Sequence, residues 1–254
     1  MCSFEFSVLN TRVGFKSRFI ANMLATSKGL SDDLDPLTFT SPVTHVYNPL
    51  AYAWKMNETF ITRYCQEKPK AVLLGMNPGP FGMAQTGIPF GDIDTVKNWL
   101  QIKEEIRPPD NLHPKRPILG LDCQRVEVSG SRLWGWAKDV RETPHEFFKD
   151  FFVVNFCPLV FMSETGKNIT PDKLALKERK IVFEICDHYL QKTVALLAPK
   201  RLIGIGNFAE TRLKKCFADH SNIGKILHPS PASPAANRGW QGQVKSQLAN
   251  QGIY

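Results

Sequence analysis

Short apolar runs recur along the chain and alternate with segments of helical periodicity. Four of these runs read as buried strands, at residues 71–76, 151–156, 201–205 and 225–227. The segments between them repeat apolar residues every three or four positions, which predicts helices. Alternation of strands and helices is typical of an α/β domain. We therefore predict an α/β fold built on a mostly parallel sheet.

Several helices are marked by their start signals. A capping side chain or a proline at the first helical position favours a helix start. Helices are expected over residues 50–66, from Thr170-Pro171 to about residue 197, and over residues 241–250. Further helices are expected to start at Asp92, at Ser129 or Ser131, and at Asn207.

Residues 25–42 are rich in Ser, Asp, Thr and Pro, which predicts a flexible lead-in. The chain has 254 residues, of which 43% are hydrophobic, enough for one sizeable core. We expect an N-terminal extension over residues 1–44, partly flexible, and one folded catalytic domain over residues 45–254.

The most distinctive stretch is residues 75–91, directly after the first apolar run. It contains five glycines and three prolines. Glycines let backbone approach a ligand closely, and prolines restrict the loop to few conformations. Phe81 and Phe90 offer flat apolar faces, and Asn77 offers a donor and an acceptor. This combination suits a flat heterocycle with polar edges, such as a nucleobase.

Polar residues follow three of the predicted strands: Asn77, Asn155 and His228. In open α/β sheets, ligands bind at the carboxyl ends of the strands. An amide such as Asn155 can accept from N3–H and donate to O4 of uracil, whereas cytosine reverses both groups. His228 can donate to an oxygen that gains negative charge as a bond breaks. Structural roles stay open for each: an amide bonded to a neighbouring loop and a packed histidine.

The formal charge of +8 suggests an anionic partner, with nucleic acid as the first candidate and a solvated basic surface as the alternative. Candidate phosphate contacts are Lys115-Arg116, Lys200-Arg201, Arg212 with Lys214-Lys215, and Arg238. The six cysteines show no C-x-x-C spacing, so we expect no metal site and a reducing compartment. The N-terminus lacks the pattern of a secretory signal, so we do not expect secretion.

The stretch 75–91, together with Asn155-Phe-Cys-Pro-Leu159 and His228-Pro-Ser-Pro231, resembles the single-strand-selective monofunctional uracil-DNA glycosylases. The resemblance spans about residues 45–245. It implies a three-layer α/β/α fold around a mostly parallel four-stranded sheet. It also implies removal of uracil and oxidised uracils, such as 5-hydroxymethyluracil, from single- and double-stranded DNA.

The same resemblance implies that an abasic site is left for base excision repair, with no metal or cofactor. It implies a nuclear location if the source is a eukaryote, and a cytoplasmic one otherwise. We expect no membrane partner, and a monomer because the sequence carries no oligomer signal.

Residue roles also follow from the resemblance. Asn77 would place the attacking water and His228 would stabilise charge on uracil O2. The expected base-binding residues are Met76, Gly79, Met83, Phe90 and Asn155, with Gly79 and Met83 shaping the pocket near C5. The expected DNA contacts are Ser230, Pro231, Ala232, Ser233 and Arg238.

Ala232 departs from the family, which often has an arginine directly after His-Pro-Ser-Pro. We therefore expect a stronger preference for single-stranded substrate than in arginine-bearing relatives. Two alternatives stay open: a glycosylase for another deaminated base, and a non-catalytic nucleic-acid-binding protein. A protein that only binds nucleic acid does not need this combination of polar side chains. The presence of Asn77, Asn155 and His228 therefore argues against the second alternative.

Overall fold

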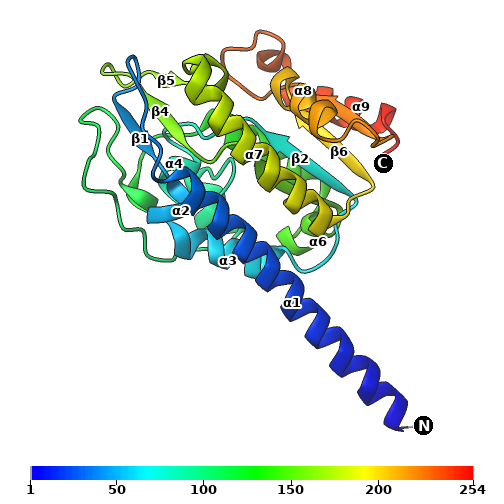
Figure 1. The fold of residues 1–254 in the computed structure, drawn as a ribbon. Helices are drawn as coiled ribbons and strands as arrows, with labels where there is room; N and C mark the ends of the chain where they lie inside the picture. Colours follow the sequence, from blue (N-terminus) through cyan, green and yellow to red (C-terminus); the bar gives the residue numbers. More distant parts are fainter. Residues whose placement is uncertain (1, 254) are drawn as a thin grey trace.

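The computed structural model describes residues 2–253, with side chains from residue 16 onward. Its centre is a parallel sheet in the order β3-β2-β6-β7 (Figure 1). The strands are β2 (Ala71–Gly75), β3 (Phe151–Asn155), β6 (Arg201–Ile205) and β7 (Ile223–Ile226). All pairings between them are parallel. The predicted α/β class with a four-stranded parallel sheet is confirmed.

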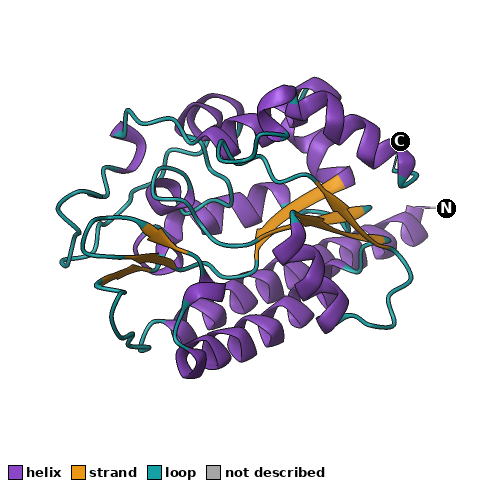
Figure 2. Cartoon of the chain, turned by 90° about the horizontal axis from the view of Figure 1, so that it is seen from above, coloured by secondary structure: helices purple, strands orange, loops and turns teal. Residues whose placement is uncertain are grey.

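Helices cover both faces of this sheet and complete three layers (Figure 2). On one face, Phe183 and Phe208 pack edge-on against Phe156, with ring centroids 5.4 and 5.6 Å away. On the other face, Trp136 packs against Phe151 at 5.3 Å. The larger helices of the second half of the chain are α5 (Val128–Val140), α6 (Pro144–Asp150), α7 (Leu176–Leu197), α8 (Asn207–Cys216) and α9 (Trp240–Asn250).

A second, antiparallel sheet stands beside the first, in the order β1-β4-β5. Its strands are β1 (His45–Tyr47), β4 (Val160–Met162) and β5 (Asn168–Ile169). The Tyr47 hydroxyl accepts from the His113 amide at 2.7 Å, which ties the long loop after residue 100 to this sheet. Strands of two or three residues are too short to show a period-two pattern, so the sequence did not predict them.

The N-terminal segment differs from the expectation for residues 25–42. Helix α1 (Cys2–Leu34) continues through most of that stretch, and its C-terminal half lies along α7 (Figure 1). Met23 is buried there. The Asn48 side-chain amide donates to the carbonyl and hydroxyl oxygens of Ser31 at 3.2 and 3.1 Å. The polar composition that suggested flexibility instead supplies specific hydrogen bonds.

Some helix boundaries also differ from their predictions. The helix expected over residues 50–66 is broken at Ala53 into α2 (Pro49–Tyr52) and α3 (Trp54–Tyr64). The side chain that caps α5 is Glu127, not Ser129 or Ser131, because its carboxylate accepts from the Ser129 amide. The remaining short elements are α4 (Met83–Thr86), the π-turn η1 (Thr95–Trp99), and the 3-10 turns η2 (Gly120–Asp122), η3 (Pro171–Lys173) and η4 (Ala236–Arg238).

Two features bear on function class. Within residues 2–253, no helix is both long and apolar enough to cross a membrane. The described side chains include no group of three His, Cys, Asp or Glu residues placed to hold a metal ion.

Candidate active site

A cavity of about 430 Å³ opens at the carboxyl ends of the parallel strands. This volume suits a small ligand. Nine predicted site residues line it: Met76, Asn77, Gly79, Met83, Phe90, Asn155, His228, Ser230 and Pro231. Strand order explains the grouping, because Asn77 follows β2, Asn155 ends β3 and His228 follows β7. Segments far apart in sequence thus meet at one rim.

Three predicted DNA contacts do not line the cavity. Ala232 and Ser233 continue the loop after Pro231, and Arg238 ends η4. Ala232 and Arg238 are exposed and Ser233 is half-buried. They therefore lie outside the lining of the cavity, with Ala232 and Ser233 directly after its lining residue Pro231.

Asn155 ends β3 directly beside Gly75 of β2. Its Oδ1 atom is buried without a hydrogen-bond partner within the described chain. Its Nδ2 atom lies 3.3 Å from the Met83 sulfur, a weak acceptor. Leaving a buried acceptor unpaired costs about 1–3 kcal/mol. An amide kept at that cost, in the wall of a cavity, is suited to bind a ligand edge.

Phe90 presents its ring beside that amide. Its backbone is held at φ +55°, with its carbonyl accepting from Trp134 Nε1 at 2.9 Å and from the Asp92 amide at 2.7 Å. A Cβ atom on Gly75 would lie 2.6 Å from the Phe90 ring and would also collide with Asn155 Oδ1. Gly75 therefore allows the aromatic face and the amide to share one corner of the cavity.

His228 enters the cavity with a defined proton position. The Ser230 amide donates to its Nδ1 atom at 3.1 Å, so the neutral ring carries its proton on Nε2. Burial lowers the pKa of His228 and favours this neutral form. Gly206 packs against the ring, where a Cβ would lie 3.1 Å from His228 Cβ. The result is a fixed neutral donor.

Asn77 is oriented by the loop that follows β3. Its Nδ2 atom donates to the Leu159 and Pro78 carbonyls, each at 3.4 Å. With the amide nitrogen so engaged, the amide oxygen is the group left to accept from a water or substrate hydroxyl.

Seven further residues line the cavity. Pro78, Pro80 and Gly82 belong to the stretch 75–91, whereas Glu127, Ser129, Asn168 and Thr170 were not predicted to face a ligand. Asn168 Oδ1 is buried without a partner in the described chain, as is Asn155 Oδ1. Asn168 sits in the short strand β5, which the sequence pattern does not reveal. Glu127 directly precedes α5 and caps it. Its position in the sequence gives no sign that its side chain also lines the cavity.

Several other candidates have structural roles. Asp92 accepts from the Thr95 amide, as a capping residue does. Phe81 does not line the cavity; the guanidinium of Arg125 stacks on its ring at 4.8 Å. Arg212, a predicted phosphate contact, is instead buried in an ion pair with Asp187. A guanidinium so enclosed cannot reach a phosphate.

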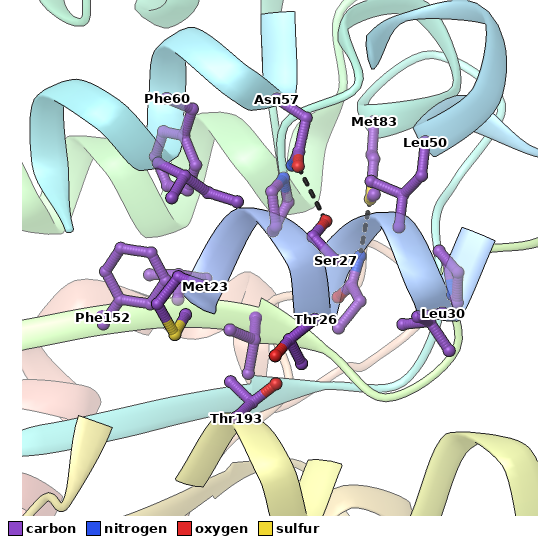
Figure 3. A pocket seen from close by; sticks show the side chains of 16 residues that line it. Met23, Thr26, Ser27, Leu30, Leu50, Asn57, Phe60, Met83, Phe152 and Thr193 are labelled. Carbon is purple, nitrogen blue, oxygen red and sulfur yellow. Dashed lines mark hydrogen bonds between the residues drawn. The ribbon is translucent and has the colours of Figure 1, made fainter. Parts of the chain in front are cut away.

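A second, smaller cavity of about 80 Å³ adjoins the first, and Figure 3 shows the side chains that line it. Met83 and Asn155 line both cavities and form the wall between them. Its far side is closed by α1, where Ser27 donates to Asn57 at 2.9 Å. Helix α1 therefore covers the rear of the candidate site.

The planar ring of Phe90, the buried Asn155 amide and the neutral His228 donor thus lie together at the rim of the parallel sheet of an α/β protein. The family model described as the Uracil DNA glycosylase superfamily matches residues 62–248. The chain belongs to this superfamily.

Sequence similarity to known proteins extends over most of the chain. It is 44% identical over 227 residues to a Bos taurus protein named single-strand selective monofunctional uracil DNA glycosylase, covering 88% of this chain and 84% of the relative. A Rattus norvegicus protein of the same name is 43% identical, covering 88% and 82%. The crystal structure of Pedobacter heparinus SMUG2 shares the fold, with a TM-score of 0.67 and 20% identity, covering 91% and 96% of the chains.

Proposed function

We propose that this protein is a monofunctional DNA glycosylase that hydrolyses the N-glycosidic bond of uracil and leaves an abasic site. The observation that carries the proposal is the buried Asn155 amide with an unpartnered Oδ1, facing the same cavity as Phe90 and the His228 donor. An amide in that position matches the N3–H and O4 edge of uracil and mismatches cytosine.

The target base must leave the helix to enter the cavity, which costs a few kcal/mol and least in single strands. It would then stack on Phe90 while Asn155 Oδ1 accepts from N3–H and Nδ2 donates to O4. Each buried polar atom of the amide would thereby gain a partner, which offsets the cost of leaving Oδ1 unpaired.

Bond breakage would leave an electron-deficient sugar and a uracil anion. The His228 Nε2–H group would donate to O2 as that oxygen becomes negative, without losing its own proton. A fixed neutral donor suits this role because it needs no reorganisation as charge develops. Asn77 would hold the water that adds to the sugar carbon, and a carboxylate base is not required once the bond has largely broken.

We extend the proposal to oxidised uracils such as 5-hydroxymethyluracil, and to both single- and double-stranded DNA, with the protein acting as a monomer without cofactor. The predicted contacts with the DNA strand are Ser230, Pro231, Ala232, Ser233 and Arg238, of which Pro231, Ala232 and Arg238 are exposed. The location would be nuclear in a eukaryotic source and cytoplasmic otherwise.

The test is a panel of single-stranded oligonucleotides that differ only in one base: uracil, 5-hydroxymethyluracil, hypoxanthine, cytosine and thymine. The proposal expects excision of the first two and sparing of cytosine and thymine. Preferred excision of hypoxanthine would instead indicate a glycosylase for another deaminated base. Tight DNA binding with no excision from any strand would favour the non-catalytic alternative.

A further inference from the structure

Glu127 caps α5 and also lines the candidate site. No step of the proposed function uses its carboxyl group. Its Oε1 atom accepts from the Ser129 amide at 3.2 Å. A Cβ on Gly79 would lie 2.6 Å from its Oε2, and one on Gly82 would lie 2.8 Å from its Cγ. The two glycines thus leave the space that this side chain fills, and Oε2 is directed to the Gly79 side of the cavity.

The side of the bound base that meets Glu127 follows from its neighbours. In the proposed complex, Asn155 Nδ2 donates to uracil O4, and the Met83 sulfur lies 3.3 Å from that nitrogen. Met83 therefore flanks O4, and the ring atom next to C4 on that side is C5. Gly82, which Glu127 touches, directly precedes Met83. His228 holds the opposite, O2 side. The carboxyl consequently lies toward C5.

Bulk alone does not decide which C5 substituents fit. Met83 is flexible and unbranched, and the cavity of about 80 Å³ behind it offers room for it to yield (Figure 3). That space exceeds the ~10–15 Å³ that a cavity needs to hold one water. A methyl and a hydroxymethyl group could both be accommodated sterically, so chemistry must separate them.

We propose that Glu127 is the specificity-determining residue for the C5 substituent, accepting a hydroxymethyl group by a hydrogen bond and disfavouring a methyl group. This inference rests on the proposed function. An ionised carboxylate accepts from the hydroxyl, and a protonated one donates to it or accepts from it. A methyl group can neither donate nor accept a hydrogen bond. It would displace water from the carboxyl group without replacing the hydrogen bonds that the water made. Glu127 is half-buried in the wall of the cavity, and this burial raises its pKa.

The first test compares two substrates on the unaltered protein. 5-Hydroxymethyluracil and 5-ethyluracil have substituents of nearly equal size, and only the first carries a hydroxyl. We expect kcat/KM for the hydroxymethyl base to exceed that for the ethyl base by about 10- to 100-fold, the scale of a hydrogen bond to a charged group. Equal values would overturn the proposal.

The second test uses Glu127→Met, an unbranched apolar replacement, beside Glu127→Gln, which keeps hydrogen-bonding groups. The ratio of kcat/KM for 5-hydroxymethyluracil over uracil should fall about 10- to 100-fold in Glu127→Met and be largely restored in Glu127→Gln. Glu142→Gln, at an exposed carboxyl, is the matched control. A purely structural role would lower both rates together, and an unchanged ratio in Glu127→Met would overturn the proposal.

The rate of uracil excision by the unaltered protein distinguishes a failure of the proposed function from a failure of the role of Glu127. No uracil excision would refute the proposed function. Normal uracil excision with no discrimination by the hydroxyl would refute only the role of Glu127.

Discussion

Gly75→Ala tests whether the corner shared by Phe90 and Asn155 is built as described. Gly75 lies in β2 and has no left-handed φ, so alanine is tolerated by the backbone and the effect is purely steric. The added Cβ would lie 2.6 Å from the Phe90 ring, below any normal contact. Phe90 is pinned by two hydrogen bonds to its carbonyl, and Asn155 by pairing with residue 75 itself.

Neither neighbour can retreat without moving a site atom by a sizeable fraction of an ångström. Misplacement of about 1 Å costs on the order of 10²-fold in rate, which corresponds to about 2.7 kcal/mol of transition-state stabilisation. Overpacking should also lower the free energy of unfolding by about 1–3 kcal/mol.

The assay is single-turnover excision of uracil from a labelled single-stranded oligonucleotide, with thermal unfolding measured in parallel. Gly242→Ala is the matched control, because Gly242 is exposed in α9 and a Cβ there meets nothing within 4 Å. A Gly75→Ala protein with the unaltered rate would refute the geometry proposed for the base-binding corner.

Three further substitutions test individual roles. His228→Ala should lower the single-turnover rate by about 10²–10³-fold; an unchanged rate would rule out the donor role. Asn155→Asp should lower uracil excision by at least about 10²-fold, since an ionised carboxylate cannot donate to O4, and undiminished excision would contradict this. Ala232→Arg should raise the duplex-to-single-strand rate ratio about tenfold, by offsetting ~1.4 kcal/mol of the flipping cost. Gly242→Arg supplies the same charge elsewhere, and an equal rise in both variants would show that the added charge acts independently of its position after His-Pro-Ser-Pro.

Strands β2, β3 and β6 were predictable because they are largely apolar runs, whereas β7 includes Lys225 and was predicted at residues 225–227 but spans Ile223–Ile226. Strand β6 was predicted with its observed bounds, and β2 and β3 within one residue. Parallel strands also place their carboxyl ends together, so polar residues after separate strands could be grouped in advance. Asn77, Asn155 and His228 do line one cavity.

The features that the sequence pattern did not predict depend on contacts between segments that are distant in sequence. Glu127 was not singled out in the sequence, where Ser129 or Ser131 was expected to cap the helix. Its place in the cavity depends on the space left by Gly79 and Gly82, more than forty positions earlier. The helical state of residues 25–34 likewise depends on burial against α7 and on Asn48, which a local polar composition does not convey.

We expect this cavity to remove uracil from DNA without cutting the strand. The decisive experiment is a single-turnover reaction on a single-stranded oligonucleotide with one uracil, analysed with and without alkali, beside a thymine control. We expect a cut at the uracil only after alkali, and none at thymine. An intact strand after alkali, or a cut before it, would refute the proposed monofunctional glycosylase activity.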